Sequence, residues 1–335
     1  MKISVIIPTC NRKTNLLALL KNLNDSITPL HEVIIVDSGE EKLSEPEYAD
    51  FHNFQLHYLH SEKSVCIQRN IGIRKATAQW VLLCDDDIEI PADYIQKLVS
   101  HIRSFPQAGA VSGVWLQLEK NEWKSTYPER SAIELIWKFI FQLSIWGEIN
   151  CPANNILIKK IKQYYIKRGN HISKAGWPVI TNFSGDYFTT PVYSLGASLV
   201  KKEWLLDSPF DEVLDRYGIG DNYGVIMSFP INHVHVLNNT FVHHHQEATN
   251  RLNKPLQYYR RALALDYFRK TKSALKKVKK RWLLWSLTGN LIRFIFSGNW
   301  RMIHAASESI RIIFTNRNPY YKAIKRDQKI IEPIL

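Results

Sequence analysis

Short apolar runs alternate with amphipathic stretches over the first 114 residues. The apolar runs have the length and near-continuous hydrophobicity of strands buried on both faces of a sheet, and they fall at residues 3–7, 32–36, 55–59, 80–84 and 109–114. Apolar residues recur at helical spacing in three intervening stretches, at residues 15–23, 65–78 and 91–105. This alternation predicts an α/β fold in which a mostly parallel, Rossmann-like sheet is flanked by helices and joined by right-handed crossovers.

Polar side chains follow directly after three of these expected strands. They are Thr9 and Arg12, then Asp37 and Ser38, then Asp85, Asp86 and Asp87. Ligands of open α/β sheets bind outside the carboxyl ends of the strands, so we expect these side chains at the edge of a site. Three adjacent carboxylates repel one another, and Mg²⁺ or Mn²⁺ shared with a nucleotide phosphate would relieve the repulsion. A solvated acidic turn is the alternative for the three aspartates.

The pattern loosens after residue 114. Residues 131–149 are apolar but are interrupted by charged residues, which makes them a poor membrane span. They predict either a helix at an interface or over an acceptor, or a helix packed on the core. A further strand is expected at residues 233–237, shortly before His243, His244 and His245.

Composition indicates a globular protein of a reducing compartment. Among 335 residues, 45% are hydrophobic and four are scattered cysteines, so neither a zinc site nor a disulfide framework is predicted. The first residues are a short apolar run cut by Pro8, which we interpret as a strand and not as a signal peptide. We therefore expect a cytoplasmic protein, working at the inner face of the cell membrane.

Positive charge is concentrated near the carboxyl end. The net charge is +13, and residues 254–281 hold eleven Lys or Arg and one acid, Asp266. The basic window runs into Trp-, Leu- and Phe-rich sequence, a composition typical of helices lying in a membrane interface, so we predict peripheral membrane contact through residues 269–314. A helical hairpin packed on the rest of the protein is the alternative. A nucleic-acid-binding module is a further reading of the charge, but the apolar continuation favours lipid, and no nucleic acid partner is expected.

Four motifs, in order over about ninety residues, resemble the family 2 glycosyltransferases, inverting sugar-nucleotide enzymes of the GT-A fold. They are VIIPTCNR at 5–12, IIVDSG at 34–39, QRNIG at 68–72 and LLCDDD at 82–87. Neither a G-x-G-x-x-G nor a Walker loop is present, which argues against dinucleotide enzymes and P-loop NTPases. A nucleotidyltransferase would also use a metal bound by carboxylates, but the segment after the first strand is not the Gly-rich basic loop of that class.

The resemblance implies a role for each matching residue. It places Pro8, Thr9 and Arg12 in the nucleoside pocket, Asp37 at the base, Arg69 at the base or diphosphate, Asp85 and Asp86 at the donor, and Asp87 at the metal. It also implies that Asp221 is the general base, although Gly220 stands where the family has a glutamate. Some metal-dependent relatives have a histidine near residue 243 as a third protein ligand, which makes His245 a candidate ligand of Mn²⁺ or Mg²⁺, with His243 the alternative.

The expected organisation has four parts: a donor-binding half (1–114), a variable acceptor-side insertion (115–190), an acceptor and catalytic half (191–255) and an added basic helical segment (256–335). The resemblance implies a metal-dependent inverting glycosyltransferase that uses a nucleoside-diphosphate sugar, with a UDP-sugar favoured, and a saccharide or lipid-linked acceptor. Because of Gly220, a relative that binds the nucleotide sugar without transferring it is the alternative.

Overall fold

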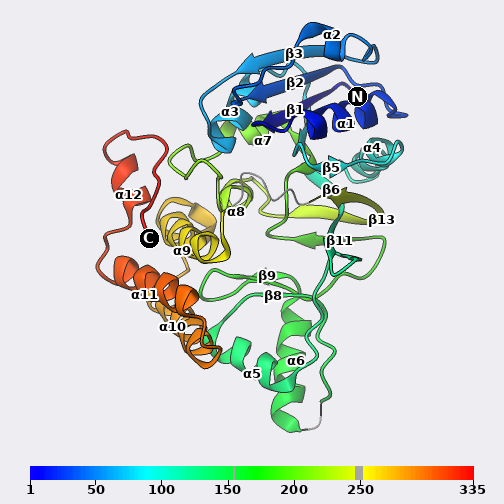
Figure 1. Ribbon diagram of the computed structural model, residues 1–335. Helices are drawn as coiled ribbons and strands as arrows, with labels where there is room; N and C mark the ends of the chain where they lie inside the picture. Colours follow the sequence, from blue (N-terminus) through cyan, green and yellow to red (C-terminus); the bar gives the residue numbers. More distant parts are fainter. Residues whose placement is uncertain (154, 246–251) are drawn as a thin grey trace.

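In the computed structural model, which describes residues 1–153, 155–245 and 252–335, ten strands form the central sheet (Figure 1). Its main path runs β11-β13-β6-β12-β4-β1-β2-β3, with β5 paired to β13 and β7 paired to β6. The strands of this path and its two short additions are β1 Ile3–Thr9, β2 Glu32–Asp37, β3 Gln55–His60, β4 Trp80–Cys84, β5 Ile88–Glu89, β6 Ala110–Glu119, β7 Glu122–Lys124, β11 Tyr187–Thr190, β12 Ala197–Lys201 and β13 Val234–His244.

Strands β1 to β4 are parallel and lie close to the predicted apolar runs. Strands β2 and β3 follow on one side of β1, whereas β4 pairs with its other side, so the strand order reverses at β1. The reversal leaves a crevice outside the carboxyl ends of β1 and β4, which is the usual ligand position in such sheets. Sheet order therefore brings the residues after Thr9 next to the three aspartates after Cys84.

The other half of the sheet is mixed. Strand β12 lies antiparallel between β4 and β6, and β11 is antiparallel to β13, while β6 and β13 are parallel. The prediction of a mostly parallel sheet thus describes the first four strands, and the full sheet keeps the predicted α/β class. The difference arises because β12 follows the long insertion, and strands that no crossover helix joins directly are free to pair in either direction.

Two layers of helices cover the parallel half. Alternate residues of β1 point to opposite faces, so Ile3, Val5 and Ile7 pack in the core shared with α1 (Lys13–Asn24) and α4 (Tyr94–Ser104). Ile6 faces the other side, where α3 (Val65–Lys75) approaches so closely that a Cβ on Gly72 would lie 2.4 Å from Ile6 Cγ2. The close packing of α3 on β1 and β2 fixes the side chains that α3 carries toward the crevice.

The insertion forms a small layer of its own. It contains α5 (Ala132–Phe141), α6 (Ile156–Arg168) and a three-stranded sheet of β8 (Ile145–Trp146), β10 (Pro178–Ile180) and β9 (His171–Ile172). Only the first part of the apolar stretch 131–149 is helical, because Gln142 adopts a left-handed conformation (φ 55°) that ends α5. Helix α5 packs on the core through Phe141, whose ring stacks 4.7 Å from Trp285, while Ile133 is 80% exposed.

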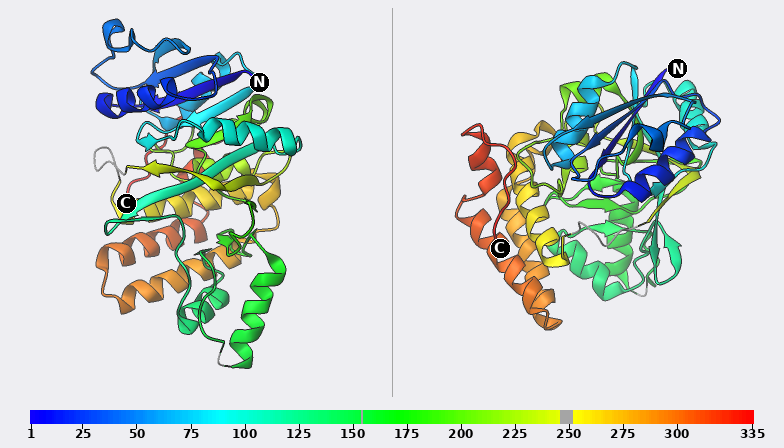
Figure 2. Two further views of the ribbon diagram at one scale, coloured as in Figure 1. Left: turned by 90° about the vertical axis from the view of Figure 1, so that its right-hand side faces the viewer. Right: turned by 45° about the horizontal axis from the view of Figure 1, so that its top comes forward.

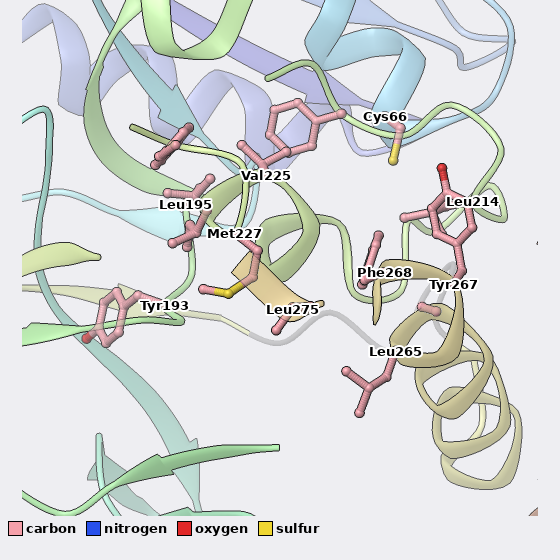
Figure 3. Close-up of a cluster of buried hydrophobic side chains, with 14 of the residues drawn as sticks. Cys66, Tyr193, Leu195, Leu214, Val225, Met227, Leu265, Tyr267, Phe268 and Leu275 are labelled. Carbon is pink, nitrogen blue, oxygen red and sulfur yellow. The ribbon is translucent and has the colours of Figure 1, made fainter. Parts of the chain in front are cut away.

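The carboxyl-terminal helices share a buried core with the preceding part of the chain and do not form a separate unit. They are α9 (Lys254–Thr271), α10 (Lys280–Phe296), α11 (Trp300–Phe314) and α12 (Pro319–Ile324), preceded in the chain by the short α7 (Lys202–Asp207) and α8 (Asp221–Ile226). Cys66 of α3, Val225 of α8 and Phe268 of α9 belong to one buried cluster (Figure 3). Figure 2 shows the same helices beside the sheet from two further directions. No helix in the described ranges combines the length and hydrophobicity needed to cross a membrane.

Tyr94 joins three elements of the core. Its hydroxyl donates to the carbonyl of Ala197 at 2.6 Å and accepts from the amide of Gly113 at 2.8 Å, so it links α4 to β12 and β6. Tyr94→Phe leaves the Gly113 amide without this acceptor and the Ala197 carbonyl with only a long 3.5 Å bond from Ser112 Oγ. We therefore expect it to lower the free energy of unfolding by about 2 kcal/mol, measured by urea denaturation. Tyr48→Phe is the control, since the Tyr48 hydroxyl makes no hydrogen bond within the described residues; an equal effect of both changes would contradict the assignment.

Candidate functional site

A cavity of 360 Å³ opens at the carboxyl edge of the sheet, where the strand order reverses. It is lined by eight of the residues singled out in the sequence: Pro8, Thr9, Arg12, Arg69, Asp85, Asp86, Asp87 and Asp221. Asp37 and His245 are not part of its lining. The structure therefore brings together motifs from β1, α3, β4 and α8, although their roles stay predictions.

Asp86 ties the ends of β1 and β4 together. Thr9 Oγ1 donates to Asp86 Oδ2 at 2.7 Å, and the Arg12 guanidinium donates to Asp86 Oδ1 at 2.8 Å and to Asp87 Oδ2 at 3.3 Å. Burial raises the pKa of Asp86 to about 6, against the opposing effects of Arg12 and Thr9. Both Asp86 oxygens are therefore engaged within the protein, which favours a supporting position for this carboxylate beneath the cavity.

The imidazole beside Asp87 belongs to His244. His244 Nε2 lies 3.2 Å from Asp87 Oδ1, and both residues line the cavity. His245 Nε2 lies instead 3.1 Å from Glu89 Oε2, and its side chain is half exposed. Residues of a strand alternate between faces, so His243 and His245 share the side away from Asp87. The predicted metal role of His245 stays untested, but its position favours His244.

Arg69 lies between two carboxylates from distant parts of the chain. Its guanidinium donates to Asp85 Oδ1 at 2.6 Å, makes a short ion pair with Asp221, and stacks 5.1 Å from the Phe210 ring. Burial by itself lowers the pKa of Arg69, but Asp221 and Asp85 raise it above its ordinary value. The resemblance implies a position for Arg69 at the base or diphosphate; the structure places it between Asp85, which follows β4, and Asp221, which begins α8.

Asp221 is the first residue of α8 and is only 7% exposed. The backbone amide of Asn222 donates to its Oδ1 at 2.6 Å, and burial raises the pKa of Asp221 to about 6 despite the Arg69 cation. Gly220 precedes it with φ 98°, and a Cβ there would lie 3.2 Å from the Ala264 Cβ on α9. The family's glutamate is therefore disfavoured at this position by backbone strain and by the approach of α9.

Asp37 lies behind the cavity and is 4% exposed. Its Oδ1 accepts from the amide of Gly39 at 2.7 Å, and its Oδ2 accepts a short hydrogen bond from the Tyr58 hydroxyl. Gln68 holds the two neighbouring strand ends together, because its amide nitrogen donates to the carbonyls of Thr9 and Val36, each at 2.7 Å. The role of Asp37 at a nucleotide base remains a prediction.

Several lining residues carry no motif and were missed in the sequence. They are Lys63, Arg216 and Gln257, among others. Lys63 and Arg216 add positive charge to a cavity whose acidic side is built by Asp85 and Asp87. No local pattern marks these residues, because they reach the cavity from loops and helices whose positions depend on tertiary packing.

A divalent cation fits one part of the cavity. Within residues 1–153, 155–245 and 252–335, no three acidic, His or Cys side chains form a preassembled metal cluster. Asp87 and His244 nevertheless converge, and a carboxylate with an imidazole is a donor set that suits Mn²⁺. Two protein ligands are also what sites shared with substrate phosphates commonly provide. The residues present therefore fit a cation completed by a ligand.

A second cavity of 520 Å³ lies on the other side of Asp221. It shares Asp221 and Asn222 with the first cavity and is bounded by the insertion and by α9 and α10. Its aromatic lining residues are Trp146, Trp177, Tyr193, Tyr223, Tyr258 and Phe268. A buried carboxylate thus stands between a charged cavity and a larger, aromatic one.

Comparison with known sequences identifies relatives of the first half of the chain. Residues 4–160 match the family described as glycosyl transferase family 2. An uncharacterized glycosyltransferase of Bacillus subtilis, YwdF, is 32% identical over 107 residues, which are 31% of this chain and 39% of that protein. One from Haemophilus influenzae is 32% identical over 108 residues, 31% of this chain and 35% of its own length. The matches therefore span less than half of each relative.

The fold extends the similarity to the whole chain. The crystal structure of S. aureus TarS residues 1–349, in complex with UDP-GlcNAc, has a TM-score of 0.52 at 13% sequence identity. The alignment covers 100% of this chain and 95% of the TarS structure. The architecture, including the carboxyl-terminal helices, is therefore of the GT-A type.

The ion pairs of Arg69 predict a pH-dependent loss of stability. We expect Arg69→Met to lower the free energy of unfolding by about 3 kcal/mol at pH 8, because Asp85 and Asp221 then lack their cation. The loss is expected to shrink at pH 5: burial already raises the pKa of Asp221 to about 6, and without Arg69 it rises further, so the folded state takes up the proton. Urea denaturation at pH 5 and pH 8 measures the free energy of unfolding of wild type and of Arg69→Met.

Arg74→Met is the matched control, since Arg74 lies on the same helix but is 59% exposed. A loss that is the same at pH 5 and pH 8 would mean that lost packing, and not uncompensated charge, explains the effect of Arg69→Met.

Proposed function

Residues 4–160 belong to glycosyl transferase family 2, and from this premise we propose that the chain is a cation-dependent, inverting glycosyltransferase. It transfers a sugar from a nucleoside-diphosphate sugar to a hydroxyl group of a saccharide or lipid-linked acceptor. One observation carries the proposal: Asp221 lines both the charged cavity at the strand ends and the aromatic cavity beyond it. A base in that position reaches a donor from one side and an acceptor from the other.

The donor occupies the charged cavity in this proposal. Pro8 and Thr9 form its wall at the end of β1, and Lys63 and Arg216 offer positive charge to a diphosphate. Asp87 and His244 would hold the cation, which when bound balances the negative charge of the diphosphate leaving group. UDP-GlcNAc, the ligand in the TarS structure, is the first donor to test.

Asp221 is the general base. Its carboxylate accepts the proton of the acceptor hydroxyl while that oxygen bonds to the anomeric carbon and the bond from that carbon to the diphosphate breaks. A pKa of about 6 leaves Asp221 ionised at neutral pH and still basic enough to take up the proton. Arg69 holds one Asp221 oxygen and Asn222 the other, so the carboxylate is oriented before the acceptor arrives.

The acceptor occupies the aromatic cavity. Residues 1–114 and 191–255 would then supply the donor site and the base, while 115–190 together with α9 and α10 would supply the acceptor walls. This division makes the fourth segment, 256–335, a structural part of the acceptor site as well as a basic surface.

A donor panel tests the proposal. We expect one nucleotide sugar to bind and to be hydrolysed slowly with Mn²⁺ or Mg²⁺, and the activity to disappear with EDTA. Asp87→Ala is expected to weaken cation-dependent donor binding, whereas Asp221→Asn keeps donor binding and lowers turnover by about 100-fold or more. Calorimetry measures binding, and release of the nucleoside diphosphate measures turnover.

Asp93→Ala is the control for loss of a carboxylate, because Asp93 lies at the start of α4, outside both cavities. The proposal fails if no nucleotide sugar binds with any cation, or if Asp87→Ala and Asp93→Ala are equally active. Turnover that persists in Asp221→Asn would remove Asp221 as the base while leaving the donor site in place.

Membrane contact is part of the proposal and is located at one end of the molecule. At the turn between α10 and α11, Phe296 is 84% exposed and Trp300 is 79% exposed, with Arg301 next in the chain. Helices α5 and α6 reach the same end in Figure 1 and in the left view of Figure 2. Ile133 of α5 and Ile156 of α6 are exposed as well. Exposed aromatic and aliphatic side chains beside cations fit an anionic membrane interface at the inner face of the cell membrane.

Vesicle binding tests this contact. We expect the double change Phe296→Ser and Trp300→Ser to weaken binding to anionic phospholipid vesicles by more than about 10-fold, because two large apolar side chains no longer enter the interface. The control is the double change Ile27→Ser and Leu206→Ser. These two residues are 58% and 47% exposed and lie away from the turn between α10 and α11. Binding to RNA in place of vesicles, or equal loss in both double variants, would contradict the proposal.

A further inference from the structure

One face of α9 forms a wall of the larger cavity. The residues of this face follow one another at helical spacing and are Tyr258, Arg261, Ala264, Leu265 and Phe268. Arg261 is the single charged residue among them. Arg261 is exposed to the cavity. The residues that follow it on α9, Ala262 to Phe268, are all buried.

The cavity is positively charged. Three cationic residues line it, Lys138, Arg261 and Arg293, against one acid, Asp221, which Arg69 already pairs. Lys138 Nζ lies 2.6 Å from Glu129. Arg293 likewise has a partner outside the lining, Glu134, at 2.6 Å.

Arg261 differs from the other two cations. Across residues 1–153, 155–245 and 252–335 no carboxylate lies within ion-pair distance of its guanidinium. The side chain of Arg261 is exposed on the wall of the cavity, so its guanidinium is available to an anionic group of a bound ligand.

We propose that the acceptor carries an anionic group, a phosphate or a carboxylate, which Arg261 binds while the attacking hydroxyl of the same acceptor reaches Asp221. The inference rests on the proposed function and names the substrate class of its acceptor cavity. A guanidinium donates two parallel hydrogen bonds to either anion, and this geometry selects orientation as well as charge. The half-buried rings of Trp146 and Tyr223 provide apolar faces against which sugar rings pack.

A binding experiment tests Arg261 without requiring knowledge of the natural acceptor. The probe is inorganic phosphate, titrated into protein whose donor cavity is first saturated with the nucleotide identified in the donor panel. Phosphate binding is followed by tryptophan fluorescence, because Trp146 and Trp177 line the larger cavity. We expect Arg261→Gln to weaken phosphate binding by about 10- to 100-fold and Arg261→Lys to weaken it less. Arg103→Gln, the same change at an exposed site on α4, is expected to have no effect.

A transfer experiment distinguishes the two anions. Wild-type protein is given neutral sugars and their matched phosphate and uronate forms, for example glucose, glucose 6-phosphate and glucuronate. We expect one anionic form to have the higher kcat/KM, and Arg261→Gln to remove that preference through KM while changing kcat/KM for the neutral sugar less than about 3-fold. Preference for glucose 6-phosphate assigns a phosphate, and preference for glucuronate assigns a carboxylate.

The outcomes separate this inference from the function on which it rests. If wild-type protein binds no nucleotide sugar, the proposed function fails, whatever Arg261 does. If the donor binds but phosphate affinity is equal in wild type and Arg261→Gln, or if Arg261→Gln reduces transfer to neutral and anionic acceptors alike, the anion site is overturned while the transferase proposal stands.

Discussion

The buried guanidinium of Arg69 is the interaction on which the site depends. It joins Asp85, which is 16 residues away in the chain, to Asp221, which is 152 residues away. Without a cation between them, two carboxylates facing a common cavity would repel each other and separate. Asn70, next on the same helix, adds a second link, because its amide exchanges hydrogen bonds at 2.9 and 3.0 Å with the backbone of Phe210. Helix α3 therefore positions the end of β4 and the segment from Phe210 to Asp221 against each other.

Close backbone approach sets the remaining geometry. A Cβ on Gly196 would lie 2.2 Å from Asp85 Oδ2, so the chain before β12 passes directly beside the carboxylate that Arg69 holds. The amide of Asp85 also donates to the carbonyl of Gly196 at 2.7 Å. At the other end of the ion pair, Gly220 lets the chain turn into α8 next to α9. The aspartates are thus positioned by backbone packing as well as by charge.

The two cavities differ in chemistry. The one at the strand ends combines carboxylates, an imidazole and basic residues, whereas the one beyond Asp221 combines aromatic rings with cations. Helix α9 contributes to the second cavity and to the main core at once, through Phe268 among others. The carboxyl-terminal basic segment is therefore built into the body of the protein, and its most exposed aromatic side chains, Phe296 and Trp300, lie at the turn between α10 and α11.

Much of the first half of the fold follows from sequence, because a strand buried on both faces needs a continuous apolar run and polar residues must lie at its end. Apolar periodicity located β1 to β4 closely, and the motifs contain the three aspartates and Arg69 of the charged cavity. Periodicity could not decide the strand order, the antiparallel entry of β12, the end of α5 at Gln142, or which of the three histidines lies beside Asp87. Nor could periodicity predict that Asp221 pairs with Arg69 or that Arg261 faces a cavity. These features arise from contacts between distant segments, and a local pattern records only which face of an element is apolar, not which element will cover it.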